Sequence, residues 1–137
     1  MAVKKKPVTQ KAGMSEFFTR DTANEGIKFP LYTPKGKKSD QFLIVRGIDS
    51  DAFRAASSAS QRDAAVIAQI ENEEERKSAL LESQRKLIAT LVASWSFDEE
   101  CTQENVAEFF RQAPQIMDAI DKVVSNRSVF FSISSAS

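Results

Sequence analysis

The segment LVASWSFDEECTQENVAEFFRQAPQIM, residues Leu91–Met117, contains the only tryptophan and the only cysteine of the 137-residue chain. Thr102 follows its polar run SFDEEC, and a threonine at such a position accepts a hydrogen bond from the free N–H groups that open a helix. Apolar residues then recur at the spacing of one helix face: Val106, Phe109, Phe110 and Ala113. Pro114 suits the first turn of a further helix. We therefore predict two consecutive helices that begin near Thr102 and Pro114.

Residues 72–95, upstream, give the strongest helix prediction. Glu73 precedes Lys77 by four residues, and Glu82 precedes Lys86 in the same way, an arrangement that stabilises helices. An apolar face runs along the same residues: Leu80, Leu81, Leu87, Ile88, Leu91, Val92 and Trp95. We expect one long helix over the whole range.

An earlier helix is expected to begin near Asp49 or Ser50, because either side chain can cap its first turn. Its stretch RAASSASQRDAA, residues 54–65, is rich in alanine and serine and contains no large apolar side chain. This part of the helix is therefore predicted to be exposed or loosely packed.

One β-hairpin is predicted at about residues 27–46. Ile27, Phe29 and Leu31 alternate with other residues, which is the period of a strand with one buried face. Pro30 restricts this strand to a sheet edge because proline has no N–H to donate. The stretch TPKGKKSD supplies a turn, and the apolar run QFLIV supplies the second strand.

These elements indicate a mainly α protein of about four helices with one N-terminal β-hairpin. We expect residues 24–127 to form a single domain, after a flexible basic arm at residues 1–23 and before a C-terminal tail at residues 128–137. The pair Phe17 and Phe18 is unusual for such an arm and suggests contact with the domain or with a second subunit.

The composition argues against an enzyme. The chain has no histidine, which removes the commonest general base and most zinc sites, and its four glycines form no phosphate-binding loop. Cys101 follows three acidic residues, which oppose formation of a thiolate. We expect no catalytic residue, no metal and no cofactor. No apolar run approaches the roughly 20 residues that span a bilayer, so we expect no membrane partner. A single cysteine cannot form an internal disulfide, so we expect a protein of the reducing cytoplasm.

Charge is unevenly distributed although the net charge is zero. Residues 1–46 carry ten Lys/Arg against four Asp/Glu, whereas residues 47–137 carry nine against fifteen. This asymmetry fits three interpretations: a solvated tail, a nucleic-acid-binding arm, or a basic end that meets the acidic surface of another protomer. Lys4–Lys6 and Lys35–Lys38 could contact phosphates, but no base-stacking aromatic platform accompanies them, so a nucleic-acid partner is not expected.

Six aromatic residues are the candidate partner-binding positions: Trp95, Phe97, Phe109, Phe110, Phe130 and Phe131. Exposed aromatic side chains are enriched in binding hot spots. The alternative for Trp95 and Phe97 is a place in a core beside Phe109 and Phe110. Phe130 and Phe131, flanked by serines near the chain end, either fold back on the domain or bind another surface.

Residues 26–131 resemble the tail assembly chaperones of long, non-contractile-tailed bacteriophages. The matching features are Leu91, Val92, Trp95, Phe97, the helix start TQENV, Pro114, Ile120, Asn126 and the closing pair Phe130-Phe131. The resemblance implies a non-enzymatic morphogenesis factor, here in the short form that arises without a ribosomal frameshift. Its implied partners are the tape measure protein, the tail tube protein and further copies of itself. It also implies action in the host cytoplasm and absence from the mature virion.

Two other functions are compatible with the residues. The first is a structural virion protein of the head–tail connector or tail terminator type, which would stay in the particle. The second is a basic-armed nucleic-acid binder.

Overall fold

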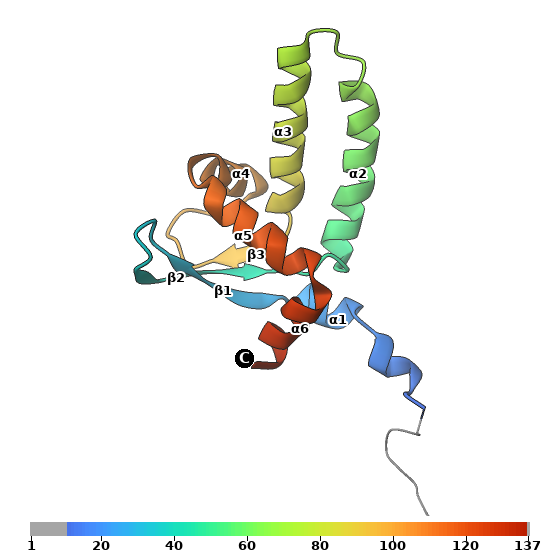
Figure 1. The fold of residues 1–137 in the computed structure, drawn as a ribbon, viewed down its shortest axis with the longest axis vertical. Coiled ribbons are helices and arrows are strands. Elements are labelled where there is room, and N and C mark those ends of the chain that lie inside the picture. The colour runs from blue at the N-terminus through green and yellow to red at the C-terminus, as the bar shows by residue number, and fades with distance from the viewer. Residues whose placement is uncertain (1–10, 137) are drawn as a thin grey trace, which may run out of the picture.

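The structure, a computed structural model, describes residues 11–136 as a small antiparallel sheet surrounded by helices (Figure 1). The order along the chain is a short 3-10 helix η2 (Met14–Phe17), α1 (Arg20–Glu25), β1 (Ile27–Tyr32), β2 (Lys38–Val45), α2 (Asp51–Ile67), α3 (Glu73–Ala89), β3 (Val92–Trp95), α4 (Gln103–Gln112), α5 (Pro114–Ser125) and α6 (Arg127–Ala136). The predicted mainly α fold with an N-terminal hairpin is confirmed. Six α-helices form in the described chain rather than about four, because α1 and α6 lie in segments expected to be arm and tail.

The sheet has the strand order β1-β2-β3, with both neighbouring pairs antiparallel. The hairpin register places Ile27 opposite Val45 and Phe29 opposite Leu43. Strand β1 lies at an edge, as Pro30 predicted, and its register is irregular between Pro30 and Tyr32. The proline therefore occupies the position where its missing N–H costs least.

Strand β3 corrects the prediction of one helix over residues 72–95. Helix α3 ends at Ala89, and Leu43 of β2 pairs with Trp95 of β3. The free edge of β2 provides the physical reason, because its backbone groups need partners once they are buried. The Arg46 N–H donates to the Leu91 carbonyl at 2.6 Å, and the Arg46 guanidinium donates to the Thr90 carbonyl at 2.7 Å.

The expected apolar face of residues 80–95 is therefore divided between two environments. Ile88, Leu91 and Val92 are buried. Leu80 and Leu81 remain on the surface of α3, with 48% and 45% of their area exposed. The C-terminal part of this segment therefore packs in the core, whereas Leu80 and Leu81 do not.

Helix starts follow the sequence closely. Ser50 accepts a hydrogen bond from the Phe53 N–H at 3.2 Å, and Thr102 accepts one from the Asn105 N–H at 3.1 Å. Pro114 is the first residue of α5. These local capping predictions are confirmed because each depends on residues within one helical turn.

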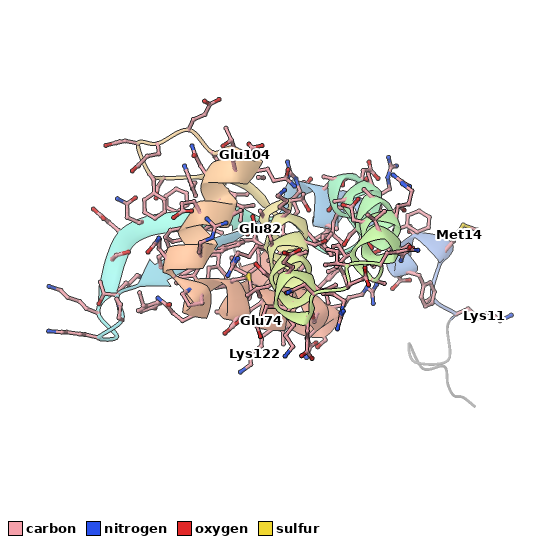
Figure 2. The ribbon with its side chains drawn as sticks, turned by 90° about the horizontal axis from the view of Figure 1, so that it is seen from above. Lys11, Met14, Glu74, Glu82, Glu104 and Lys122 are labelled. Atoms are coloured by element: carbon pink, nitrogen blue, oxygen red, sulfur yellow. The ribbon has the colours of Figure 1, made fainter. Side chains whose placement is uncertain are left out.

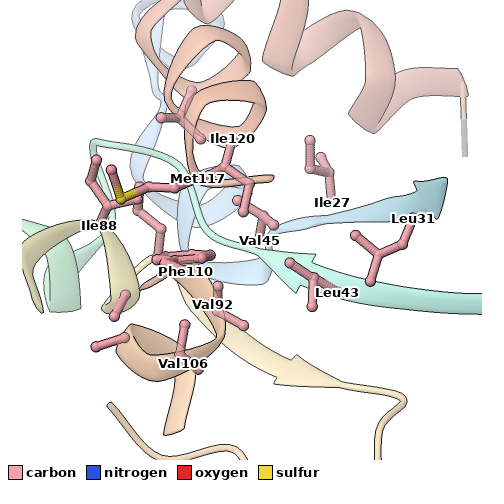
Figure 3. Packing of buried hydrophobic residues seen from close by; sticks show 14 of the residues in the cluster. Ile27, Leu31, Leu43, Val45, Ile88, Val92, Val106, Phe110, Met117 and Ile120 are labelled. Carbon is pink, nitrogen blue, oxygen red and sulfur yellow. The ribbon is translucent and has the colours of Figure 1, made fainter. Parts of the chain in front are cut away.

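The core lies between one face of the sheet and helices α3 to α6 (Figure 3). Its largest fully buried side chains are Phe110, Phe130, Leu43, Leu91, Ile120, Val45, Val106 and Val124. Burying a side chain of this size stabilises a fold by about 1.5–3 kcal/mol. The aromatic ring that α6 contributes, Phe130, folds back into this core rather than projecting from it.

Two contacts join the chain ends to the sheet. The Gly47 N–H donates to the Ala23 carbonyl at 2.9 Å, so α1 packs directly on the end of β2.

Asp49 receives hydrogen bonds from Arg127 at 2.8 Å and from Arg54 at 2.5 Å. The hydrogen bond from Arg127 holds the pKa of Asp49 well below its usual range, Arg54 adds to this, and partial burial opposes it. Helices α1 and α6 thus meet at one corner, where Ala23 and Phe130 both lie beside Gly47. The part of the expected arm before residue 11 lies outside the described residues.

We predict that Gly47→Ala destabilises the protein by about 1–3 kcal/mol. A Cβ at this position would lie 2.9 Å from the Ala23 Cβ and 3.2 Å from the Phe130 ring, so packed groups would have to move. Thermal unfolding of the purified variant measures the effect. Gly13→Ala is the matched control, because a Cβ there meets nothing within 4 Å and stability should not change. Equal melting temperatures for Gly47→Ala and the unaltered protein would contradict the close packing of α1.

Asp49→Asn should destabilise the protein by about 1–3 kcal/mol at neutral pH, because the charged hydrogen bonds from Arg127 and Arg54 are weakened. The folded-state pKa of Asp49 is depressed, so its contribution is present above the unfolded pKa of about 4 and is lost as the pH falls below that value. Unfolding by urea at neutral pH and near pH 3 tests this. The difference between the two proteins should shrink in acid, and a constant difference would contradict the role of the charge.

Candidate partner-binding surfaces

Three of the predicted aromatic residues form a half-buried triangle at the end of β3. The ring centroids of Trp95 and Phe97 are 5.1 Å apart, those of Phe97 and Phe109 are 5.2 Å apart, and those of Trp95 and Phe109 are 5.9 Å apart. All three pairs meet edge to face, the arrangement that the ring quadrupoles favour. The Trp95 indole N–H donates to the Glu99 carbonyl at 2.7 Å, which holds the loop between β3 and α4 beside the rings.

A pocket of about 340 Å³ opens against this triangle. Besides the three rings it is lined by Glu99, Asn105, Glu108 and Gln112. Glu99 and Glu108 are the only charged residues of the described chain that line it, so the edge of the pocket is acidic. Hydrogen bonding from Gln112, with the nearby Arg111, lowers the pKa of Glu108 and keeps its carboxylate ionised. The site combines an apolar floor with a negative edge.

The remaining candidate aromatic residues do not line the pocket. Phe110 is 0% exposed and Phe130 is 2% exposed, so in this conformation both are core side chains. Phe131 is half-buried on α6, with its ring centroid 5.9 Å from that of Phe130. The structure thus brings Trp95, Phe97 and Phe109 together at the surface, with the buried Phe110 ring beneath them at 6.2 Å from that of Phe109, and places Phe130 and Phe131 on α6.

A second surface, which the aromatic residues do not indicate, lies on the α2–α3 hairpin that stands away from the sheet (Figure 1). Helix α2 has 17 residues and none of them is buried. A groove of about 540 Å³ runs between the two helices and is lined by Ala56, Ala59, Ser60, Asp63, Val66, Ile67, Ala79, Glu82, Ser83, Lys86, Leu87 and Gln103. Val66 is 71% exposed. In the sequence, the stretch RAASSASQRDAA indicates this groove, because its small side chains cannot fill the space between two helices.

Ion pairs fix the base of this groove to the body of the protein. Glu82 of α3, labelled in Figure 2, accepts hydrogen bonds from Arg111 of α4 at 2.7 Å and from Arg85 at 3.0 Å. These bonds, that of Arg111 first, lower the pKa of Glu82. The hairpin is therefore held at its base although its outer part makes few buried contacts.

Other kinds of site are not found in residues 11–136. This part of the chain has no group of three or more Cys, Asp or Glu side chains placed to hold a metal ion. None of its helices is both long enough and apolar enough to cross a membrane. Burial raises the pKa of the Cys101 thiol, which reduces its reactivity at neutral pH.

Comparison with models of protein families matches residues 14–125 to the phage tail assembly chaperones. The chain belongs to this family. The predicted resemblance is confirmed, and the match includes both the aromatic pocket and the α2–α3 groove. Searches of curated proteins and of solved structures find no match. Membership in a tail assembly chaperone family implies contact with tail proteins and suggests a role without catalysis, so the two surfaces are the places to look for such contacts.

Proposed function

We propose that this chaperone binds the tape measure protein of the phage along the α2–α3 groove and helps to recruit tail tube subunits around it. The observation that carries the proposal is the unfilled apolar groove between two protruding helices. The protein acts without catalysis, in the host cytoplasm, and does not remain in the mature virion.

The shape of the groove suits a helical client. Each of its two helices has 17 residues, which corresponds to a length of about 25 Å or several helical turns. Small residues such as Ala56, Ala59 and Ala79 let a third backbone approach closely. An amphipathic helix bound in a groove is a recurring mode of peptide recognition. A tape measure protein is long and helical, and its apolar stripes need to be covered until tube subunits enclose it.

The chemistry of the groove favours reversible binding. Its floor is apolar, whereas Asp63, Glu82 and Lys86 add charges of both signs at its edges. A single groove of this size buries far less surface than a permanent interface, so each contact is weak and several copies must act together. We propose that the chaperone self-associates along the client and that tail tube subunits displace it.

The candidate aromatic residues divide between these tasks. Trp95, Phe97 and Phe109 form the second partner-binding surface, which is separate in sequence from most of the groove. Phe131 is only half-buried and remains a proposed contact on α6. Phe110 and Phe130 support these surfaces from the core.

We predict that Ala59→Gln reduces capture of the tape measure protein about tenfold, or about 1.4 kcal/mol, because the longer side chain fills the groove. Co-expression of the two proteins, scored by how much tape measure protein stays soluble and co-purifies, measures the loss. Ala65→Gln is the matched control, because this exposed alanine of the same helix does not line the groove.

Equal capture by Ala59→Gln and Ala65→Gln would show that the client binds elsewhere. Mass spectrometry of purified virions distinguishes the proposed chaperone from the main alternative, a structural protein of the virion. Stoichiometric recovery of the chain from virions, together with no complex in the co-expression, would favour a connector or terminator protein of the particle.

A further inference from the structure

Three large apolar side chains are exposed before the first helix of the domain. Met14 is 79% exposed, Phe17 is 73% exposed and Phe18 is 61% exposed. Met14 and Phe17 lie one turn apart in η2, so they point to the same side. The Gly13 N–H donates to the Glu16 carboxylate at 2.9 Å and stabilises this turn. A preformed turn with exposed aromatic side chains is a surface that lacks its partner.

The arm and the aromatic pocket have opposite charges. Residues 1–18 contain four lysines and one glutamate. Residues 96–110 contain five acidic residues and no basic one, and two of the five, Glu99 and Glu108, line the pocket. Aromatic contact is also possible between the arm and the pocket. The arm exposes two phenylalanine rings, and three aromatic rings line the pocket, against which further rings can pack. Complementary charge steers such contacts and selects the partner.

The arm and the elements that line the pocket lie apart in one molecule. Figure 2 shows Glu104, at the start of α4, well away from Lys11 and Met14, and in Figure 1 β3 and α4 lie toward the side opposite to the segment that precedes α1. The arm is held in place from residue 20 onward, because Arg20 forms hydrogen bonds with Asp51 at 2.8 and 2.9 Å and Ala23 is buried. The arm therefore meets the pocket of a different molecule.

We propose that the arm of one copy places Phe17 and Phe18 in the Trp95–Phe97–Phe109 pocket of the next copy. Lys11 then faces the acidic edge of the pocket at Glu99, beside the exposed carboxylates of Asp98 and Glu100. This inference rests on the self-association in the proposed function and names the two surfaces that carry it. The pocket volume of about 340 Å³ suits aromatic side chains rather than a whole helix.

The consequence of this contact is a head-to-tail assembly. Because different surfaces meet, the arrangement repeats and forms either a closed ring or an open helical array. The α2–α3 groove takes no part in the contact, so each copy keeps its client surface free. Such an array would present a series of grooves to one long helical client.

The test uses the full chain and two variants that change only exposed residues. Phe17→Ser with Phe18→Ser removes the apolar part of the arm, and Asp98→Lys with Glu99→Lys reverses the charge of the rim. Sedimentation velocity at increasing concentration should show assemblies for the unaltered protein. Each variant alone should need a roughly tenfold higher concentration, or more, to associate.

The decisive measurement is a mixture of the two variants. One variant keeps its pocket and the other keeps its arm, so the mixture should form a one-to-one dimer and nothing larger. Trp95 is the only tryptophan and lies in the pocket, so its fluorescence should change when the dimer forms. Raising NaCl from about 0.05 M to about 0.5 M should weaken association, because the screening length shortens.

Three results would overturn the proposal: an unaltered protein that stays monomeric, an arm variant that associates like the unaltered protein, or variants that fail to pair when mixed. An arm variant that associates normally but loses salt-sensitive retention on DNA would assign the arm to nucleic acid instead. Ala59→Gln should associate like the unaltered protein. Loss of tape measure capture in that variant, with association intact, separates failure of the groove from failure of the arm contact.

Discussion

Strand β2 is the element on which the rest of the structure depends, because it is hydrogen-bonded along both edges. Leu43 and Val45 on its inner face are 0% exposed, and the helical layer packs over them. After β2 the chain forms the α2–α3 hairpin, and it then returns to the sheet as β3, which pairs with β2. Since both ends of this excursion are attached to one buried strand, the hairpin is held in position without a core of its own.

This attachment explains how a small protein can expose so much apolar surface on the hairpin. The Ser50 cap and the Glu82–Arg111 ion pair hold the base of the hairpin, while Val66, Leu80 and Leu81 remain exposed above it. In an isolated helical pair such side chains would favour collapse or aggregation. Here the sheet supplies the stability, and the hairpin keeps an exposed apolar surface, which is the one we propose for the client.

The two candidate surfaces differ in chemistry, and this difference supports separate partners. The groove is lined by small side chains with charges of both signs at its edge, which suits the close approach of a helix. The aromatic pocket is rimmed by acidic residues and suits a basic segment that carries aromatic side chains. A tail assembly chaperone that contacts its client and its own copies at different sites can do both at once.

Local features of this protein were determined by the sequence alone. The caps at Ser50 and Thr102, the edge strand with Pro30 and the start of α5 at Pro114 depend on neighbouring residues. The tertiary structure alone decided that Val92–Trp95 forms a strand, because its partner β2 lies more than forty residues earlier in the chain. It also decided that Phe110 and Phe130 are core whereas Trp95, Phe97 and Phe109 reach the surface. Apolar side chains look alike in a sequence whether they fill a core or face a partner, and only the packing of distant segments distinguishes them.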